Sequence, residues 1–211
     1  VALDKTGAHL AVGGRDKIAI VYALEDGRHG RGGAAAPAVE MEVAIGSFIY
    51  TIDLTPDARR LAIGTVDSCV YVYAVLGSAA GPSASAGKLL HVLNHDGGIQ
   101  SVVWSPDANF LAVGGEEHAV TVWQLRQPET AQADERVPTP SEPYIVLPRP
   151  SSVHSVAFSD VSLAFASGSL ATVYGGPGDY GWSDRPSFEV IADVMDHPTA
   201  LSALITQHAT V

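Results

Sequence analysis

One sequence block recurs three times in this chain at nearly constant spacing. Each copy joins a Leu-Ala-Val-Gly or Leu-Ala-Ile-Gly run to a nearby segment rich in β-branched and aromatic residues. The copies begin at Leu10, Leu61 and Leu111, which gives a period of about 50 residues. Such self-similarity is the signature of a repeat architecture, in which each unit buries its face against a neighbouring unit. We therefore expect the function to lie in a surface built by repeats rather than in a catalytic cluster.

Each repeat unit is predicted to form four short β-strands. An alternating segment such as residues 49–54 opens the unit, and a Ser/Thr-Pro-Asp turn connects it to the Leu-Ala-Val/Ile-Gly block. The aromatic-rich segment is the third strand, and a weaker fourth strand precedes the next unit. Four antiparallel strands per unit are typical of a β-propeller blade.

The composition narrows the class of partner. The chain has 211 residues, with 12 Lys and Arg against 23 Asp and Glu, so its formal net charge is −11. This charge repels phosphate groups, which argues against nucleic acid or an anionic membrane as the partner. No apolar stretch is long enough to span a membrane, and Cys69 has no second cysteine with which to pair. We expect protein partners and a cytoplasmic location, with a cytoskeletal one as the narrower alternative.

The segment from His95 to Trp123 carries a family resemblance. It has a His near its start, then Ser-Pro-Asp, Leu-Ala-Val-Gly-Gly, an acidic residue and Val-Thr-Val-Trp, and in this order it resembles a WD repeat. The resemblance extends over roughly residues 1–170, although the Asp that ends the WD signature is absent from all three copies. Residues 67–73 also resemble the echinoderm microtubule-associated-protein-like subfamily, which implies a cytoskeletal or ciliary setting.

The strand pattern and the resemblance together predict an all-β fold. We expect a partial β-propeller of about four WD-type blades, the first and last incomplete, followed by a short helical C-terminal tail. The expected boundaries are blades at about 1–48, 49–98, 99–152 and 153–174, a linker over 175–186, and the start of a helical region over 187–211. Two open sheet edges are an aggregation liability. We therefore expect a fragment of a larger protein, with the rest of the same polypeptide as the partner that completes the propeller.

Three residues take positions at which WD repeats place a buried network of His, acid, hydroxyl and Trp. These residues are His95, Glu117 and Trp123, and the second strand supplies no hydroxyl. The resemblance implies a partial network that stiffens one blade, as a structural element rather than a catalyst. That these positions form no network at all is the alternative.

No sequence motif indicates an enzyme. The eight histidines lack the short paired spacing of zinc ligands, and neither a phosphate-binding glycine loop nor a Gly-x-Ser-x-Gly turn is present. A propeller hydrolase with a metal in its central channel needs several converging acidic side chains, whereas the predicted inner strands contain only one, Asp53. The sequence therefore predicts no catalytic, cofactor-binding or metal-binding residue, and no cofactor.

A candidate partner-binding rim remains. The length in excess of a usual repeat falls between the third and fourth strands of each unit, so the opposite face of the propeller has short loops. That face is predicted to present Phe48, Tyr50, Asp96, Gln100 and His154. An aromatic residue with polar neighbours on a rigid scaffold is typical of a protein-binding hot spot. The alternative is that Phe48 and Tyr50 pack between blades.

These observations favour a non-enzymatic scaffold that mediates protein–protein interaction. A second hypothesis makes the propeller a regulatory module of a larger cytoskeletal, ciliary, ankyrin-bearing or channel-type protein. The helix-like pattern near the C-terminus motivates it. A propeller hydrolase is the third alternative, and fold alone does not decide among them.

Overall fold

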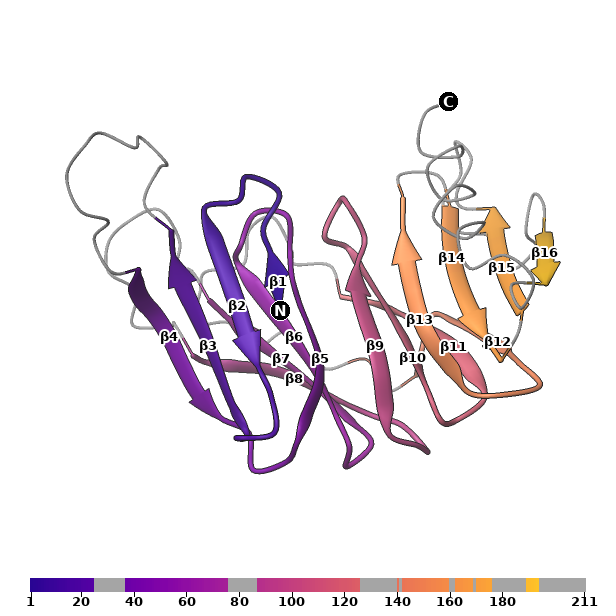
Figure 1. The fold of residues 1–211 in the computed structure, drawn as a ribbon, viewed down its shortest axis with the longest axis horizontal. Coiled ribbons are helices and arrows are strands. Elements are labelled where there is room, and N and C mark those ends of the chain that lie inside the picture. The colour runs from indigo at the N-terminus through magenta and orange to yellow at the C-terminus, as the bar shows by residue number, and fades with distance from the viewer. Residues whose placement is uncertain are drawn as a thin grey trace.

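The structure is a computed structural model that describes residues 1–24, 37–75, 87–125, 140, 142–159, 162–168, 170–175 and 189–193. Within these ranges the chain forms sixteen β-strands and no helix. The strands group into four antiparallel sheets, and each sheet consists of four strands that are consecutive in the sequence (Figure 1). We call these sheets blades 1 to 4.

Each blade runs from its inner strand to its outer strand in sequence order. Blade 1 contains β1 (Ala2–Leu3), β2 (His9–Gly13), β3 (Ile18–Ala23) and β4 (Ala38–Ala44). Blade 2 contains β5 (Ile49–Leu54), β6 (Arg60–Thr65), β7 (Cys69–Ala74) and β8 (Leu89–Asn94). Blade 3 contains β9 (Ile99–Trp104), β10 (Phe110–Gly115), β11 (Ala119–Gln124) and β12 (Ile145–Pro148). Blade 4 contains β13 (Val153–Phe158), β14 (Ser162–Ser167), β15 (Leu170–Gly175) and β16 (Glu189–Asp193).

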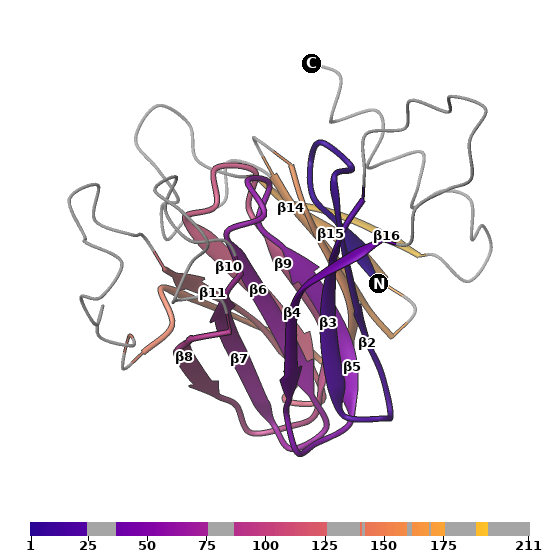
Figure 2. The same cartoon turned by 90° about the vertical axis from the view of Figure 1, so that its left-hand side faces the viewer.

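The blades follow one another in an arc, and each packs face to face against the next (Figures 1 and 2). The inner strands β5, β9 and β13 lie side by side along the concave part of this arc. Four antiparallel, four-stranded blades in this order confirm the predicted all-β fold, a partial β-propeller.

The recurring glycine of each repeat is explained by the close approach of the next blade. A Cβ at Gly64 would lie 2.5 Å from Cγ2 of Ile99, and a Cβ at Gly114 would lie 2.6 Å from Cγ1 of Val153. Ile99 and Val153 are the first residues of the next inner strands. The repeat therefore needs glycine where a side chain of the next blade comes too close for a Cβ.

The hydrophobic core consists of three clusters, one between each pair of neighbouring blades. Blade 2 presents Leu61 and Ile63 to blade 1, and Ala62, Val70 and Val72 to blade 3, all of them fully buried. The two faces of a blade thus differ, with larger residues on one side and smaller ones on the other. Alternation along each strand produces this division, because successive side chains point to opposite faces.

Side chains also bond the inner strands to one another. In each case a side-chain oxygen of one blade accepts a hydrogen bond from a backbone N–H of the next blade. The three bonds run from Val102 N to Thr51 Oγ1 (3.2 Å), from Trp104 N to Asp53 Oδ2 (2.7 Å) and from Val156 N to Ser101 Oγ (3.1 Å). Neighbouring blades are therefore held in register by polar bonds as well as by packing.

Blade 4 extends further along the chain than the sequence predicted. Residues 189–193 pair antiparallel with β15 as a fourth strand, whereas we had expected the blade to end at 174 and a helical region to begin at 187. The outermost strand of every unit carries the weakest pattern, because it pairs on one side only. The helix suggested by Leu201, Leu204 and Ile205 lies outside the described residues, as does most of the predicted linker.

Candidate functional site

Tight turns and short connections make up one face of the arc. We define the short-loop face as the turns between the second and third strands of each blade together with the connections that lead from one blade to the next. It lies along the lower edge of Figure 1. Two of the predicted rim residues lie here with much of their surface in solvent, since Phe48 is 42% exposed and Tyr50 is 49% exposed.

Phe48 lies between a basic and an aliphatic neighbour. The Lys17 ammonium lies 5.3 Å from the centroid of the Phe48 ring, within the range of a cation–π contact. The Val66 N–H donates to the Phe48 carbonyl at 3.1 Å, so the backbones of these two residues adjoin. Val66 is itself 42% exposed. The sequence analysis missed Val66, whose only signal was a lone apolar residue in a polar turn.

Acidic side chains follow on blade 3. A Cβ at Gly98 would lie 3.3 Å from Oε2 of Glu116 and 3.6 Å from the carbonyl oxygen of Val66. The Glu116 carboxylate therefore lies beside Gly98, next to Val66. Asp67 and Asp96 are both exposed on the same face. Asp96, one of the predicted rim residues, is thus exposed in the connection between β8 and β9.

The last two predicted rim residues bind each other. His154 Nδ1 lies 2.5 Å from Gln100 Oε1, and this hydrogen bond joins the inner strands of blades 3 and 4. The rim prediction therefore separates into two parts. Phe48, Tyr50 and Asp96 are exposed, whereas Gln100 and His154, although His154 is also exposed, bond each other.

The structure brings His95, Glu117 and Trp123 together. His95 Nδ1 lies 3.0 Å from Glu117 Oε1, and the imidazole meets the Trp123 ring edge-on at a centroid distance of 5.7 Å. The His95 side chain is almost fully buried. Its Nε2 and the Trp123 Nε1 have no hydrogen-bond partner among the described residues. In a complete network of this type a hydroxyl of the second strand would bond these nitrogens, and the second strand of this blade has no hydroxyl.

Arg60 makes two buried or part-buried polar contacts between blades, and the sequence analysis did not single it out. Its guanidinium donates to the Leu125 carbonyl at 2.5 Å and also to the Ala108 carbonyl, both in blade 3. It lies 4.5 Å from the Trp104 ring centroid. Burial lowers the pKa of Arg60, although nearby Asp57 opposes this. The one available signal was an arginine at the start of an otherwise apolar strand.

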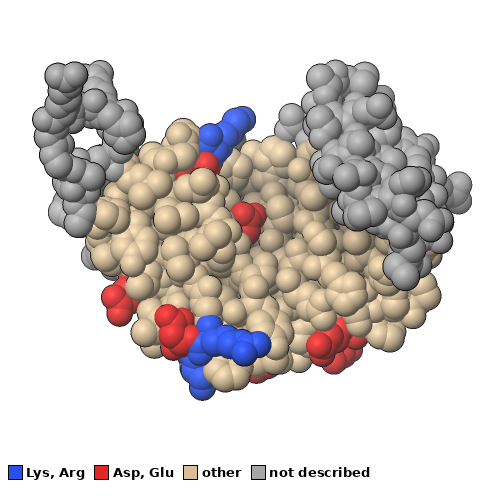
Figure 3. Space-filling view, viewed as in Figure 1, with Lys and Arg blue, Asp and Glu red and all other residues tan. Residues whose placement is uncertain are grey.

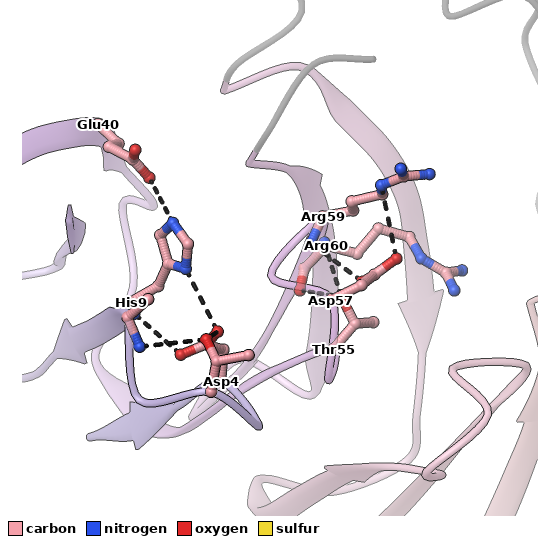
Figure 4. A network of polar contacts seen from close by, with 9 residues as sticks. Asp4, His9, Glu40, Thr55, Asp57, Arg59 and Arg60 are labelled. Atoms are coloured by element: carbon pink, nitrogen blue, oxygen red, sulfur yellow. Dashed lines mark hydrogen bonds and ion pairs between the residues drawn. The ribbon is translucent and has the colours of Figure 1, made fainter. Parts of the chain in front are cut away.

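A second polar cluster ties the outer strand of blade 1 to its first turn (Figure 4). The two ring nitrogens of His9 lie 3.4 Å from Asp4 and 3.5 Å from Glu40. Burial alone would raise the pKa of Asp4, but hydrogen bonds from Thr6 and His9 outweigh it and lower that pKa to about 2. The polar groups of this cluster bond one another, so we regard the cluster as structural.

Asp53 is the one acidic residue of the described inner strands. Burial raises its pKa to about 6, although the Trp104 N–H favours the ionised carboxylate and opposes the shift. Across the described ranges, no group of three or more His, Cys, Asp or Glu side chains is placed to hold a metal ion. In the same ranges no helix is long and apolar enough to cross a membrane.

The geometry defines a repeat protein built from propeller blades. Comparison with known proteins agrees, since the family model "WD domain, G-beta repeat" matches residues 87–124, which include the inner three strands of blade 3. The chain thus contains a WD repeat within a partial β-propeller of four blades.

Two relatives illustrate the similarity. Protein HIR1 of Kluyveromyces lactis is 33% identical over 86 residues, which cover 36% of this chain and 10% of the relative. Protein HIRA of Dictyostelium discoideum is 32% identical over 85 residues, which cover 38% of this chain and 8% of the relative. The match thus spans no more than about a tenth of these proteins. The resemblance to the echinoderm microtubule-associated-protein-like subfamily stays a prediction.

Proposed function

We propose that this chain is a non-catalytic scaffold that binds other proteins through its short-loop face. The observation that carries the proposal is the exposure of Phe48, Tyr50 and Val66 on rigid turns and strand ends. Large apolar side chains that remain in solvent on a rigid support are the usual anchors of protein interfaces. A protein is favoured over a nucleic acid because the chain carries a net charge of −11 and acidic residues border these side chains.

A comparison of co-purified proteins tests this proposal. We would tag the chain and a double variant, F48A with Y50A, and quantify by mass spectrometry the proteins that each recovers from source-cell extract. The matched control is V39A with V146A, which alters exposed residues of the outer strands β4 and β12. We expect the rim variant to lose partners that the control retains. Equal recovery by all three proteins would contradict the proposal.

We further propose that additional blades of the same polypeptide complete the propeller. Support comes from the outward face of blade 1, where Leu10 and Val12 are only half-buried. The corresponding residues of blade 2, Leu61 and Ile63, are fully buried against blade 1. The outward face of blade 1 thus carries the same kinds of apolar residue as the covered face of blade 2 but is only half-buried. This favours a further blade packed against it.

Solution size tests the additional blades. We would measure the molar mass of the 211-residue chain, and of a longer product of the same gene, by size-exclusion chromatography with light scattering. We expect the shorter chain to self-associate through its open faces and the longer one to be a monomer. A compact, soluble monomer of the shorter chain would contradict this part of the proposal. The regulatory-module hypothesis needs the same longer product and is not favoured by any separate observation.

A further inference from the structure

We propose that the short-loop face binds a protein segment with an apolar side chain flanked by a carboxylate on one side and a basic side chain on the other. The carboxylate lies toward blade 1 and the basic group toward blade 3. This inference rests on the proposed function and adds the chemistry and the orientation of the partner.

The first step is the continuity of the surface. The Lys17 ammonium lies over the Phe48 ring at 5.3 Å, and the Phe48 carbonyl accepts a hydrogen bond from Val66 at 3.1 Å. Val66 and the Glu116 carboxylate both border Gly98. Backbone contacts therefore place the residues that carry a cation, an aromatic ring and an aliphatic side chain next to one another, and the Glu116 carboxylate lies near the Val66 carbonyl, across three blades. We call these four side chains the rim row.

The second step is the fixed position of the basic end. Lys17 has a left-handed backbone with a φ of 65°, which non-glycine residues rarely adopt. Two backbone hydrogen bonds hold it there. Its N–H donates to the Gly14 carbonyl at 3.2 Å, and its carbonyl accepts from the Ile45 N–H at 2.9 Å. The Lys17 backbone is thus tied to its own turn and to the connection that carries Phe48, which favours binding because little order is lost.

The third step is the separation of charge. Arg15 and Lys17 outnumber Asp16 in the exposed turn of blade 1. At the other end of the rim row, Asp67, Asp96 and Glu116 are all exposed. Figure 3 shows basic groups together on the lower edge with one acidic group against them, and a second acidic group further to the right.

These charges decide the kind of occupant. A phosphate backbone would gain at the basic end and be repelled at the acidic end, so a nucleic acid does not fit the whole row. A polypeptide segment fits it with one residue of each kind, and the exposed Phe48 and Val66 offer the apolar contact between them. Complementary charge at the two ends sets the direction in which the segment lies.

A peptide-display selection tests the inference. The full 211-residue chain is the bait for a library of random twelve-residue peptides, and the enriched peptides are then synthesised. We expect enrichment of peptides with an acidic residue, an apolar residue and a basic residue in one order. Their affinity should fall at least about tenfold in F48A. The control variant V39A, which alters an exposed residue of β4, should bind as the wild type does.

Charge exchange tests the orientation. K17E should weaken the selected peptides by about two- to fivefold, as expected for an exposed ion pair. A peptide in which Lys replaces the acidic residue should recover that loss in K17E, and should not do so in E116K. Likewise, a peptide in which Glu replaces the basic residue should recover the loss in E116K, and should not do so in K17E. Circular dichroism of each variant checks that the fold is retained.

Three results would overturn the inference. The first is that no selected peptide depends on Phe48 for binding. The second is that the enriched peptides share no acid–apolar–base order. The third is that neither charge exchange restores binding. Loss of binding in F48A without any effect of the charge exchanges refutes this inference and leaves the proposed function intact. Absence of any Phe48-dependent binding, together with equal recovery of partners by the rim variant, refutes both.

Discussion

The contact between blades 2 and 3 includes a buried guanidinium and a buried carboxylate beside its apolar packing, whereas the corresponding positions between blades 3 and 4 carry apolar side chains. Arg60 begins the second strand of blade 2 and donates to two carbonyls of blade 3. Phe110 occupies the corresponding position of blade 3 and packs in the apolar cluster against blade 4. The inner strands differ in the same way, with Asp53 in blade 2 and Val103 in blade 3.

The same backbone repeat can therefore form two kinds of interface between blades. A buried guanidinium is costly to desolvate, and it recovers this cost only where the neighbouring carbonyls lie within reach. The contact between blades 2 and 3 is therefore sensitive to the relative placement of the blades. Apolar packing between blades 3 and 4 tolerates small shifts better, because dispersion contacts are not directional.

Replacing Arg60 should have the largest effect on the stability of the contact between blades 2 and 3. R60M fills a similar volume but leaves the Ala108 and Leu125 carbonyls without their donor. We expect a loss of about 3 kcal/mol in the free energy of unfolding. F110L, at the corresponding site of blade 3, should cost about 1 kcal/mol. Urea denaturation measures both, and an equal or smaller loss in R60M would show that Arg60 contributes packing alone.

Asp53 should make the polar interface sensitive to pH. Its pKa is raised from 3.8 to about 6 in the folded chain, so it favours folding most below 3.8 and loses this contribution as the pH rises through 6. We expect the free energy of unfolding to fall by about 1.4 kcal/mol between pH 5 and pH 7.5.

D53N is the matched variant, since its amide oxygen still accepts the Trp104 N–H while the titration is removed. Urea denaturation at both pH values should show less pH dependence in D53N than in the wild type. The same dependence in both proteins would mean that other groups cause it.

The His95–Glu117 pair should contribute less. E117Q keeps an acceptor near His95 but removes the charge, so we expect a loss of about 1 kcal/mol in the free energy of unfolding. D16N in the corresponding turn of blade 1 is the control, because Asp16 is exposed and the amide oxygen can still accept from the Ile18 N–H, so stability should change by less than about 0.5 kcal/mol. Thermal unfolding compares the two variants. Equal effects would mean that burial adds nothing to the pair.

Phe48 should have the smallest effect on stability. F48S removes a ring that is 42% exposed, and we expect the free energy of unfolding to change by no more than about 0.5 kcal/mol. Urea denaturation, as used for R60M, measures this change in the free energy of unfolding. A loss of about 2 kcal/mol would place Phe48 among the residues that hold the blades together rather than on a binding surface.

The repeat pattern predicted the blades because it is local. Each strand and turn of blades 2 and 3 follows from a segment of the sequence that repeats with its own glycine, proline and aromatic residues. Strand β16 was missed although the connection before it is no longer than those that precede β4, β8 and β12. Its pairing with β15 depends on the rest of blade 4 rather than on its own residues.

Contacts between blades were much harder to predict. His95 and Glu117 followed from the family pattern, since both belong to one repeat. Arg60 contacts Leu125, which lies 65 residues further along the chain, and this contact exists only once two blades have a fixed relative position. Val66 escaped notice for a similar reason, because its neighbours Phe48 and Gly98 come from different connections between blades.

Photo-crosslinking from the rim tests most directly whether this face binds proteins. We would incorporate p-benzoyl-phenylalanine at position 48, and separately at Val146 of β12, which is 50% exposed, and irradiate each protein in source-cell extract. We expect discrete protein adducts from position 48 that are absent from position 146. Adducts from both positions alike, or from neither, would contradict a binding role for the short-loop face.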